Sequence, residues 1–345
     1  MTTAEKRLKN LQSQYIQLAH GNGGRFMREL IDNLFAYHLN NSLLDTNTDA
    51  TAIPIDGTQE VMVTTDGFTV KPLEFPGGNI GSLAVHGTVN DLCVSGAVPQ
   101  YLTLNAFIEE GLEITQLDRI IASLGTAAKE ANVSVVAGDT KVVARGEGGG
   151  LYLATTGVGL RDKSIKLGTS QICPSDIILV SGPIGDHGIA VMLAREQFGM
   201  RGDLQSDSAN VLPLSQALLK IPGLKFMRDP TRGGLASVLH EICQSTGLNI
   251  RVFESQIPIR EPVRSVCEML GYDPYYLACE GRVVAVVSEK QADTALAALQ
   301  TLADGKQAAK IGILSEGQPH LILETELGGE RFLELLEDDP LPRIC

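Results

Sequence analysis

Apolar runs and polar turns alternate along residues 45–160 in an order that predicts strand, helix, strand, helix, strand, strand. Runs rich in β-forming residues predict the four strands at 59–66, 100–108, 133–138 and 151–160, the last two of them buried. A helix is expected over 114–133, where Thr115 and Asp118 resemble a capping box. Its apolar face consists of Ile114, Leu117, Ile120, Ile121, Leu124 and Ala128.

The order of elements recurs after residue 174 and predicts a second mixed α/β half of similar size. Its strands are expected at 176–182, 249–254, 281–288, 308–316 and 320–326, and its helices near 187–199, 210–220, 234–247, 261–270 and 292–303. The polar stretch 161–176 is typical of a domain linker, and the Gly-rich stretch 145–150 is typical of a flexible loop or hairpin tip.

The composition limits the partners of this chain. A length of 345 residues fits about two domains. The net charge of −13 argues against nucleic acid, because binding its phosphates needs clustered Lys and Arg. It leaves nucleotides possible, since Mg²⁺ and backbone amides can hold their phosphates. The chain has no apolar run of about 18 residues and no apolar signal-peptide core, so we expect neither a membrane span nor export.

The six cysteines are scattered, with no C-x-x-C pair and no zinc-like spacing. Cys93, Cys173, Cys243 and Cys267 lie in apolar stretches, so we predict that they are small buried side chains. This usage suits a reducing cytoplasm.

Three glycines, Gly21, Gly23 and Gly24, stand just before an amphipathic segment. Glycine allows close backbone approach, and a helix N-terminus offers free N–H groups to an anion. No Gly-Lys-Ser/Thr follows, so this is not a Walker A loop. The segment is therefore either a phosphate-binding loop or a simple turn.

Four aspartates follow or interrupt apolar stretches, where an unpaired carboxylate would be costly. They are Asp49, Asp66, Asp91 and Asp139. Mg²⁺ prefers oxygen ligands and usually bridges a few carboxylates to substrate phosphates. These residues are either four separate caps and turns or the ligands of a metal–phosphate site.

Three further polar residues lie close to these acids in the sequence. Lys141 follows Asp139 by two positions, on the same side of an extended strand, where it can meet a phosphoryl group or form a solvated ion pair. Asn90 adjoins Asp91, and His86 lies one helical turn earlier. His86 either faces the same site or makes a structural hydrogen bond.

The second half contributes a polar cluster, Arg228, Asp229, Thr231 and Arg232, followed by two glycines and a helix. Thr231 or a neighbour is either a helix cap or part of a cluster that faces the first half. Glu280 stands just before a buried strand, and burial in a cleft would shift the pKa of its carboxyl upward into the range of a general base.

The chain ends in Leu-Pro-Arg-Ile-Cys, with Pro340 and Pro342 just before Cys345. Proline withholds its N–H and favours an extended chain, so residues 339–345 are predicted to form an arm that reaches about 20 Å. The terminal thiol is either an accident of where the chain stops or a group that the arm carries to another site.

Together these motifs resemble the HypE family of hydrogenase maturation proteins, the carbamoyl dehydratases. The resemblance runs nearly end to end and is carried by "QLAHGNGGRFMRELI", "TTDGFTVKPLEFPGGNIGSLAVHGTVNDLCVSGA", "VVAGDTKVV", "SGPIGDHG", "RDPTRGGLASVLHE" and "LPRIC". This family belongs to the PurM-like (aminoimidazole ribonucleotide synthetase-like) ATP-binding superfamily.

The resemblance implies a two-domain α/β (α+β) fold with an extended C-terminal tail. We expect a helical, Gly-rich segment over 1–44, an N-terminal PurM-like ATP-binding domain over 45–165, a C-terminal PurM-like α/β domain over 172–336 and a flexible tail over 337–345. The N-terminal mixed sheet and its helices are expected to form the interface of a homodimer in which the sheets of two copies join.

The resemblance also implies a reaction in which the terminal cysteine carries the substrate. HypF places a carbamoyl group on Cys345, and ATP phosphorylates the thiocarboxamide oxygen, which makes it a good leaving group. Loss of phosphate then leaves a thiocyanate on Cys345. The HypC–HypD complex accepts the cyanide, which becomes a ligand of the iron in [NiFe] hydrogenase.

These implications assign roles to residues of this chain. Cys345, Lys141, Glu280 and His86 are the predicted catalytic residues, and Asp49, Asp66, Asp91 and Asp139 are the predicted Mg²⁺ ligands. The residues predicted to bind ATP are Gly21, Asn22, Gly23, Gly24, Asp49, Asp66, Asn90, Asp91, Asp139, Thr140 and Asp229. Two other hypotheses stay open here: another PurM-like ATP-dependent synthase acting on a soluble amide or selenide, and a non-catalytic scaffold that docks partners through its tail.

Overall fold

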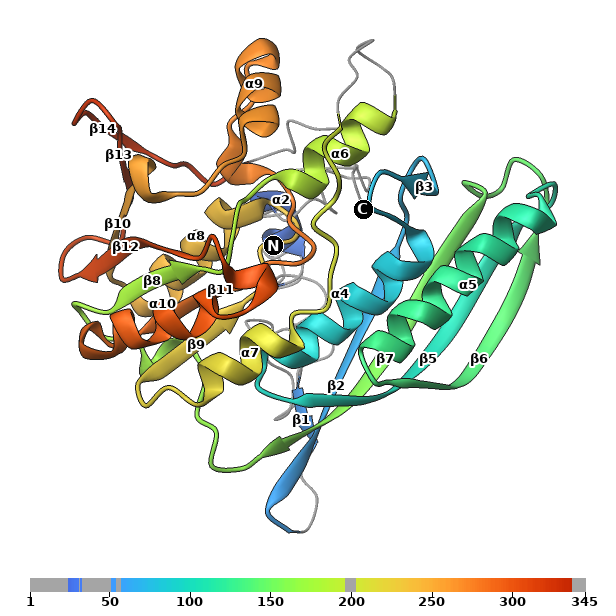
Figure 1. The fold of residues 1–345 in the computed structure, drawn as a ribbon, viewed down its shortest axis with the longest axis horizontal. Coiled ribbons are helices and arrows are strands. Elements are labelled where there is room, and N and C mark those ends of the chain that lie inside the picture. The colour runs from blue at the N-terminus through green and yellow to red at the C-terminus, as the bar shows by residue number, and fades with distance from the viewer. Residues whose placement is uncertain (1–23, 31, 33–50, 54–56, 196–202, 337–345) are drawn as a thin grey trace, which may run out of the picture.

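The computed structural model describes residues 24–30, 32, 51–53, 57–195 and 203–336. Figure 1 shows two halves, each built on its own sheet, and one continuous apolar cluster contains residues of both halves. Five predicted site residues lie outside the described residues, namely Gly21, Asn22, Gly23, Asp49 and Cys345. The tail predicted at 337–345 lies outside them as well.

The sheet of the first half has the strand order β1-β2-β7-β5-β6. Its strands are β1 (Thr51–Ile53), β2 (Gln59–Phe68), β5 (Val98–Glu109), β6 (Ser134–Val143) and β7 (Leu151–Asp162), and a hairpin of β3 (Glu74–Phe75) and β4 (Gly78–Asn79) stands apart. All neighbours are antiparallel except β5 and β6, which run parallel and are connected through helix α5 (Ile114–Glu130). The predicted mixed sheet is therefore confirmed.

Helix α4 (Ile80–Val94) packs on β2 and β7 and also against α5. The Asn79 side chain begins it by accepting the N–H groups of Gly81 and Ser82, at 2.9 and 3.1 Å. Gly96, at φ +85°, follows its last turn in a conformation that favours glycine. Every residue of α4 except Asp91 is buried, so this helix forms the centre of the molecule rather than a surface.

The second half contains a sheet of order β14-β13-β10-β12-β8-β11-β9. Its strands are β8 (Ile177–Val180), β9 (Leu224–Arg228), β10 (Asn249–Phe253), β11 (Val284–Val287), β12 (Ala309–Ser315), β13 (Leu321–Glu324) and β14 (Glu330–Phe332). Only the β10–β13 pair is parallel.

The helices of this half are α6 (Asp186–Ala194), α7 (Leu212–Leu219), α8 (Gly234–Thr246), α9 (Glu261–Leu270) and α10 (Ala292–Gln300), and α2 (Arg25–Leu30) lies beside α8. Single 3₁₀ turns occur at η3 (Thr169–Gln171), η4 (Glu254–Gln256), η5 (Pro274–Tyr276), η6 (Glu289–Gln291) and η7 (Ala303–Gly305). None of the helices in the described part of the chain combines the length and the apolar character that crossing a bilayer requires.

The structure corrects three local predictions and adds short strands that the pattern did not indicate. β6 is exposed rather than buried, because it is the edge strand of its sheet. Cys173 is exposed, whereas Cys93, Cys243 and Cys267 are buried as predicted. The capping box at Thr115 is wrong, since Glu113 is the N-cap and makes no side-chain bond. Strands β9 and β14 were not predicted, because both are short and carry charged residues.

The contact between α4 and α5 generates a test of the fold. A Cβ on Gly81 would overlap the backbone carbonyl oxygen of Ile120 in α5, whereas a Cβ on Gly125 in α5 would meet nothing within 4 Å. Gly81→Ala should therefore lower the free energy of unfolding by about 1–3 kcal/mol through overpacking. Gly125→Ala should raise it by about 0.5–1 kcal/mol through helix propensity.

Urea unfolding followed by circular dichroism measures both effects in one series. A Gly81→Ala protein as stable as the wild type would contradict the close helix contact.

Candidate active site

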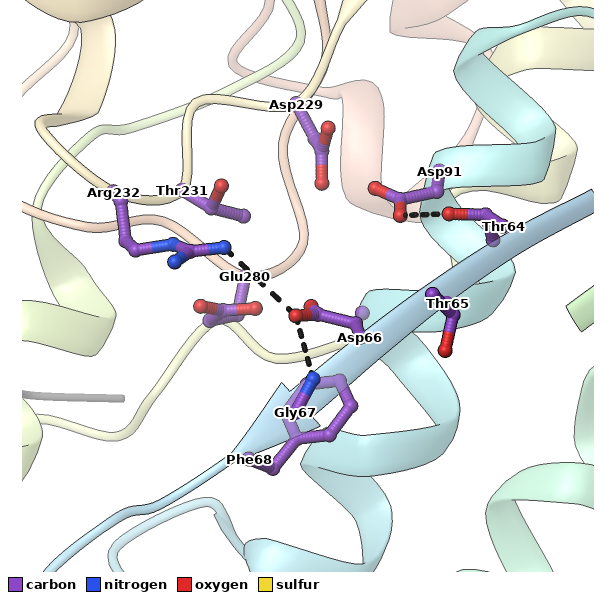
Figure 2. A pocket seen from close by; sticks show the side chains of 11 residues that line it. Thr64, Thr65, Asp66, Gly67, Phe68, Asp91, Asp229, Thr231, Arg232 and Glu280 are labelled. Atoms are coloured by element: carbon purple, nitrogen blue, oxygen red, sulfur yellow. Dashed lines mark hydrogen bonds and ion pairs between the residues drawn. The ribbon is translucent and has the colours of Figure 1, made fainter. Parts of the chain in front are cut away.

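A pocket of about 160 Å³ opens where β2 and α4 of the first half face two loops of the second half. Figure 2 shows that its acidic side chains surround a common space with Arg232 at one side. The lining residues are Thr64, Thr65, Asp66, Gly67, Phe68, Gly87, Asp91, Asp229, Thr231, Arg232 and Glu280. Both halves contribute carboxylates, so the pocket exists only when the two halves are packed together.

Asp66 enters the pocket from β2, on the face of the sheet that packs on α4. Its Oδ1 accepts the N–H of Gly67 at 2.8 Å and lies 3.8 Å from Nη2 of Arg232. Burial raises the pKa of Asp66, and the positive charge of Arg232 and the Gly67 hydrogen bond partly oppose that rise. Proton uptake is thus easier at Asp66 than at an exposed aspartate.

Asp91 enters from α4, as the one residue of that helix that is not buried. Its Oδ2 accepts a hydrogen bond from the Thr64 hydroxyl at 2.8 Å. Because Thr64 and Asp66 alternate along β2 and face the same side, one strand and one helix fix two carboxylates relative to each other.

Asp229 and Glu280 come from the second half, directly after β9 and shortly before β11. Both are buried, with 6% and 4% of their surface exposed. Burial raises the pKa of Asp229 to about 6, Arg228 opposes the rise, and the nearby Asp66 adds to it.

Among the described residues the pocket therefore collects four carboxylates, those of Asp66, Asp91, Asp229 and Glu280, against a single lining cation, Arg232. Such a set favours a hard cation, because oxygen ligands suit Mg²⁺ and a cation offsets their mutual repulsion. Within the described residues, no group of three or more Asp, Glu, His or Cys side chains is arranged to hold a metal by itself. A cation here would need further ligands, such as phosphate oxygens.

Two predicted site residues of α4 lie beside the pocket instead of lining it. His86 is buried, and its Nδ1 lies 3.0 Å from Oγ of Ser208. Burial lowers the pKa of His86 to about 4, so the ring is neutral at pH 7. Asn90 is almost completely buried, and its side chain binds only backbone groups of the second half.

Asp139, Thr140 and Lys141 lie on β6 and do not reach the pocket of their own chain. β5 and β7 separate β6 from β2, a distance of roughly 14 Å at the usual strand spacing. Asp139 is paired with Asn105, whose side chain is exposed on the face of the sheet opposite to α4. Within one chain Asp139 therefore does not meet Asp66 and Asp91, and its role as a Mg²⁺ ligand stays a prediction.

The last predicted residue, Gly24, is buried at the start of α2 and does not line the pocket. Of the two possibilities given for the cap of α8, a neighbour of Thr231 is the N-cap, namely Gly233, and Thr231 itself lines the pocket. Sequence reasoning missed the roles of Thr64, Phe68 and Gly87. The period of two along β2 was the available signal, since it places Thr64 and Phe68 on the face of Asp66.

Comparisons with known proteins cover both halves. Residues 47–161 match the N-terminal domain of AIR synthase related proteins, and residues 174–323 match their C-terminal domain. The carbamoyl dehydratase HypE of Azotobacter vinelandii is 43% identical over 338 residues, which are 97% of this chain and 99% of that protein. The Escherichia coli K12 protein of the same name is 42% identical over 335 residues, 96% of this chain and 99% of that one. This chain belongs to the carbamoyl dehydratase HypE family.

Solved structures of HypE proteins have the same fold as this family member. HypE in a HypE–HypF complex matches with a TM-score of 0.84 at 40% identity, over 89% of this chain and 99% of that one. HypE in complex with ATP matches with a TM-score of 0.79 at 41% identity, over 96% and 100%. Thiamine monophosphate kinase from Aquifex aeolicus, at 17% identity and a TM-score of 0.65 over 89% and 99%, shares the fold alone. The predicted PurM-like α/β fold is confirmed.

The raised pKa of Asp229 predicts how this HypE-family protein responds to pH. Between pH 3.8 and about 6 the folded state binds more protons than the unfolded state, so stability should fall as pH rises through this range. Asp229→Asn removes this loss. The free energy of unfolding at pH 7.5 minus that at pH 4 should therefore be larger in Asp229→Asn than in the wild type, by at most about 3 kcal/mol.

Chemical denaturation at several pH values between 4 and 8 measures the difference. The exposed Asp304→Asn is the control and should follow the wild type. If the free energy of unfolding changed with pH in the same way in Asp229→Asn and in the wild type, the raised pKa of Asp229 would be contradicted.

Proposed function

We propose that this chain catalyses the ATP-dependent dehydration of a carbamoyl group carried on Cys345. The observation that carries this proposal is the acidic pocket at the junction of the halves, in a chain over 40% identical to carbamoyl dehydratases along almost its whole length. The terminal cysteine supplies the sulfur on which such a group can travel.

ATP is proposed as the co-substrate, because a related HypE has been solved in complex with ATP. The pocket is smaller than the roughly 300 Å³ of the smallest typical ligand sites, so it fits the phosphates rather than the whole nucleotide. Asp66, Asp91 and Asp229 would hold a magnesium ion bound with these phosphates, and the ion would offset their negative charge. Arg232, beside Asp66, is placed to contact a phosphate oxygen.

The chemistry needs a nucleotide because an amide oxygen is a poor leaving group. The carbamoyl oxygen attacks the γ-phosphorus of ATP, the bond to the bridging oxygen breaks and ADP leaves. The nitrogen then loses its protons, the C–O bond breaks and phosphate leaves with the oxygen. A thiocyanate remains on Cys345. Glu280, buried in the pocket among the other carboxylates, is the proposed base for the N–H protons.

Partner proteins are proposed from the same relatives. HypF is the expected carbamoyl donor, and a related HypE has been solved in complex with HypF. The HypC–HypD complex is the expected cyanide acceptor. The five cysteines of the described residues are free thiols, which suits the proposed cytoplasmic location.

The exposed apolar side chains and the edge of the first sheet at β5 and β6 support the proposed homodimer. Large apolar side chains on β5 and β6 are 40% to 63% exposed, and they are Val98, Tyr101, Phe107, Val135, Val136 and Val142. No other strand of the described residues pairs with the outer edge of β6, which leaves backbone groups there for a partner. A second copy that joins here would cover both features. Asp139 and Lys141 would then act on ATP or the thiocarboxamide across the interface.

A mass measurement tests the reaction. After incubation with HypF, carbamoyl phosphate and ATP, Cys345 should first gain a carbamoyl group and then lose about 18 Da, the mass of one water. Glu280→Gln should retain the carbamoyl form and slow its dehydration by about 10²–10⁴-fold. Cys345→Ser is the control that should carry no modification. The dehydratase function would be refuted if no mass loss depended on ATP.

A pair of matched lysine substitutions tests the dimer. Val142→Lys on β6 should weaken self-association by at least ~30-fold, because it places a charge in the covered edge. Met269→Lys on α9 changes a side chain of similar exposure, 65% against 63%, and should leave association unchanged. Sedimentation velocity over a concentration series distinguishes them. Equal behaviour of the two variants would exclude β6 from the interface.

A further inference from the structure

The segment 206–211 runs between the two halves of the molecule and contacts both. The N–H of Ser206 donates to the carbonyl of Pro76 at 2.8 Å, and its hydroxyl lies 2.8 Å from Nδ1 of His187 in α6. Ser208 meets Nδ1 of His86 in α4 at 3.0 Å. The segment is therefore tied to both α4 and α6 by largely buried polar groups.

Asp207, in the middle of this segment, faces the loop that carries Glu280. Its side chain is fully buried, and Oδ1 accepts the backbone N–H of Glu280 at 3.1 Å. Its Oδ2 lies 3.4 Å from Nε of Arg282, whose Nε also donates to the carbonyl of Pro183. Asp207 thus contacts the backbone N–H of Glu280 and the side chain of Arg282, two residues further along the same loop.

Asn90 binds the backbone carbonyl of Glu280, whereas Asp207 binds its N–H. Its Nδ2 donates to the carbonyl of Glu280 and to the carbonyl of Ala209, both at 3.0 Å. Its Oδ1 accepts the N–H of Val211 at 2.9 Å. Both amide hydrogens and the oxygen are used, so an aspartate here would place an oxygen against two carbonyl oxygens.

The backbone spacing leaves this loop little freedom. A Cβ on Gly281 would overlap the carbonyl oxygen of Asp207, so the two segments approach as closely as glycine allows. Glu280 is consequently held at its N–H by Asp207, at its carbonyl by Asn90, and from one side by the 207–209 backbone.

We propose that Asn90 and Asp207 are positioning residues that fix the carboxylate of Glu280 in the pocket. Asn90 directly precedes Asp91, which lines the pocket from α4. One turn of this helix therefore positions both Asp91 and, through Asn90, Glu280 of the second half. This inference rests on the proposed role of Glu280 as the base. It also changes the predicted role of Asn90, which holds the loop of a catalytic residue and does not bind ATP.

The arrangement is costly as a purely structural device. Asp186, Asp207 and Arg282 are all buried, and Asp186 lies 3.3 Å from Nε of Arg260 and 3.7 Å from Nη2 of Arg282 without a hydrogen bond from either. Buried ion pairs seldom add stability over an apolar core of the same volume, because desolvation offsets their attraction. The cost of this buried cluster is explained if the cluster holds Glu280 in the position that catalysis requires.

The test measures dehydration of carbamoylated Cys345 in the full-length protein. Asn90→Ser and Asp207→Ser should each lower the dehydration rate by about 10²-fold, because a displacement of about 1 Å costs that much, while the KM for ATP changes less than about threefold. Ser215→Ala, which removes a buried hydroxyl of α7 that does not touch Glu280, is the matched control and should keep the wild-type rate. Melting temperatures identify a variant that fails to fold, and the other of the two substitutions then carries the test, because Asn90 and Asp207 contact opposite ends of the Glu280 backbone.

Combination with Glu280→Gln separates positioning from a general structural role. If Asn90 and Asp207 act through Glu280, adding either substitution to Glu280→Gln should cause little further loss. Multiplicative losses in the double variants, or wild-type rates in Asn90→Ser and Asp207→Ser, would overturn the inference. A wild-type rate in Glu280→Gln alone would instead remove the base assignment, and the positioning role would fall with it.

Discussion

Helix α4 is enclosed on every side by the rest of the chain, and the other features of the molecule depend on that packing. β2 and β7 cover one side, α5 another, and α7 and β9 of the second half a third. An apolar helix inside both halves makes them one cooperative unit. Asp91 is the single residue of this helix that is not buried, and its side chain therefore lines the pocket from a fixed position.

The carboxylates of the pocket repel one another, and this repulsion indicates that the pocket binds a ligand. Asp66 and Asp229 both resist ionisation because they are buried close together, with Arg232 as the lining cation. A fold selected for stability alone would not gather four carboxylates at an apolar junction. A divalent cation, such as the magnesium ion proposed to bind with the nucleotide, would relieve this repulsion. The repulsion between the buried carboxylates raises the free energy of the unbound protein, and its relief on binding contributes to the affinity for the cation.

Much of the fold could be predicted, because periodicity reports which face of an element is buried. The helix at α5 and the strands β2, β5 and β7 lie where the pattern placed them. Misassignments occurred where burial and sequence disagree. β6 carries valines yet is an exposed edge, and Thr115 lies one residue inside a helix whose cap is Glu113. Local sequence cannot identify an edge strand, since the number of neighbours is a property of the sheet.

The sequence by itself determined the family, the two mixed α/β halves and the acids Asp66, Asp91, Asp229 and Glu280, because motifs and strand ends are local features. Only the tertiary structure decided which of them meet. Asp139 and Lys141 lie three strands from Asp66, with Asp139 on the opposite face of the sheet, and Asn90 and His86 turn towards the segment 206–211. Residue spacing fixes which side of an element a group takes, whereas the packing of one half on the other fixes what lies opposite it.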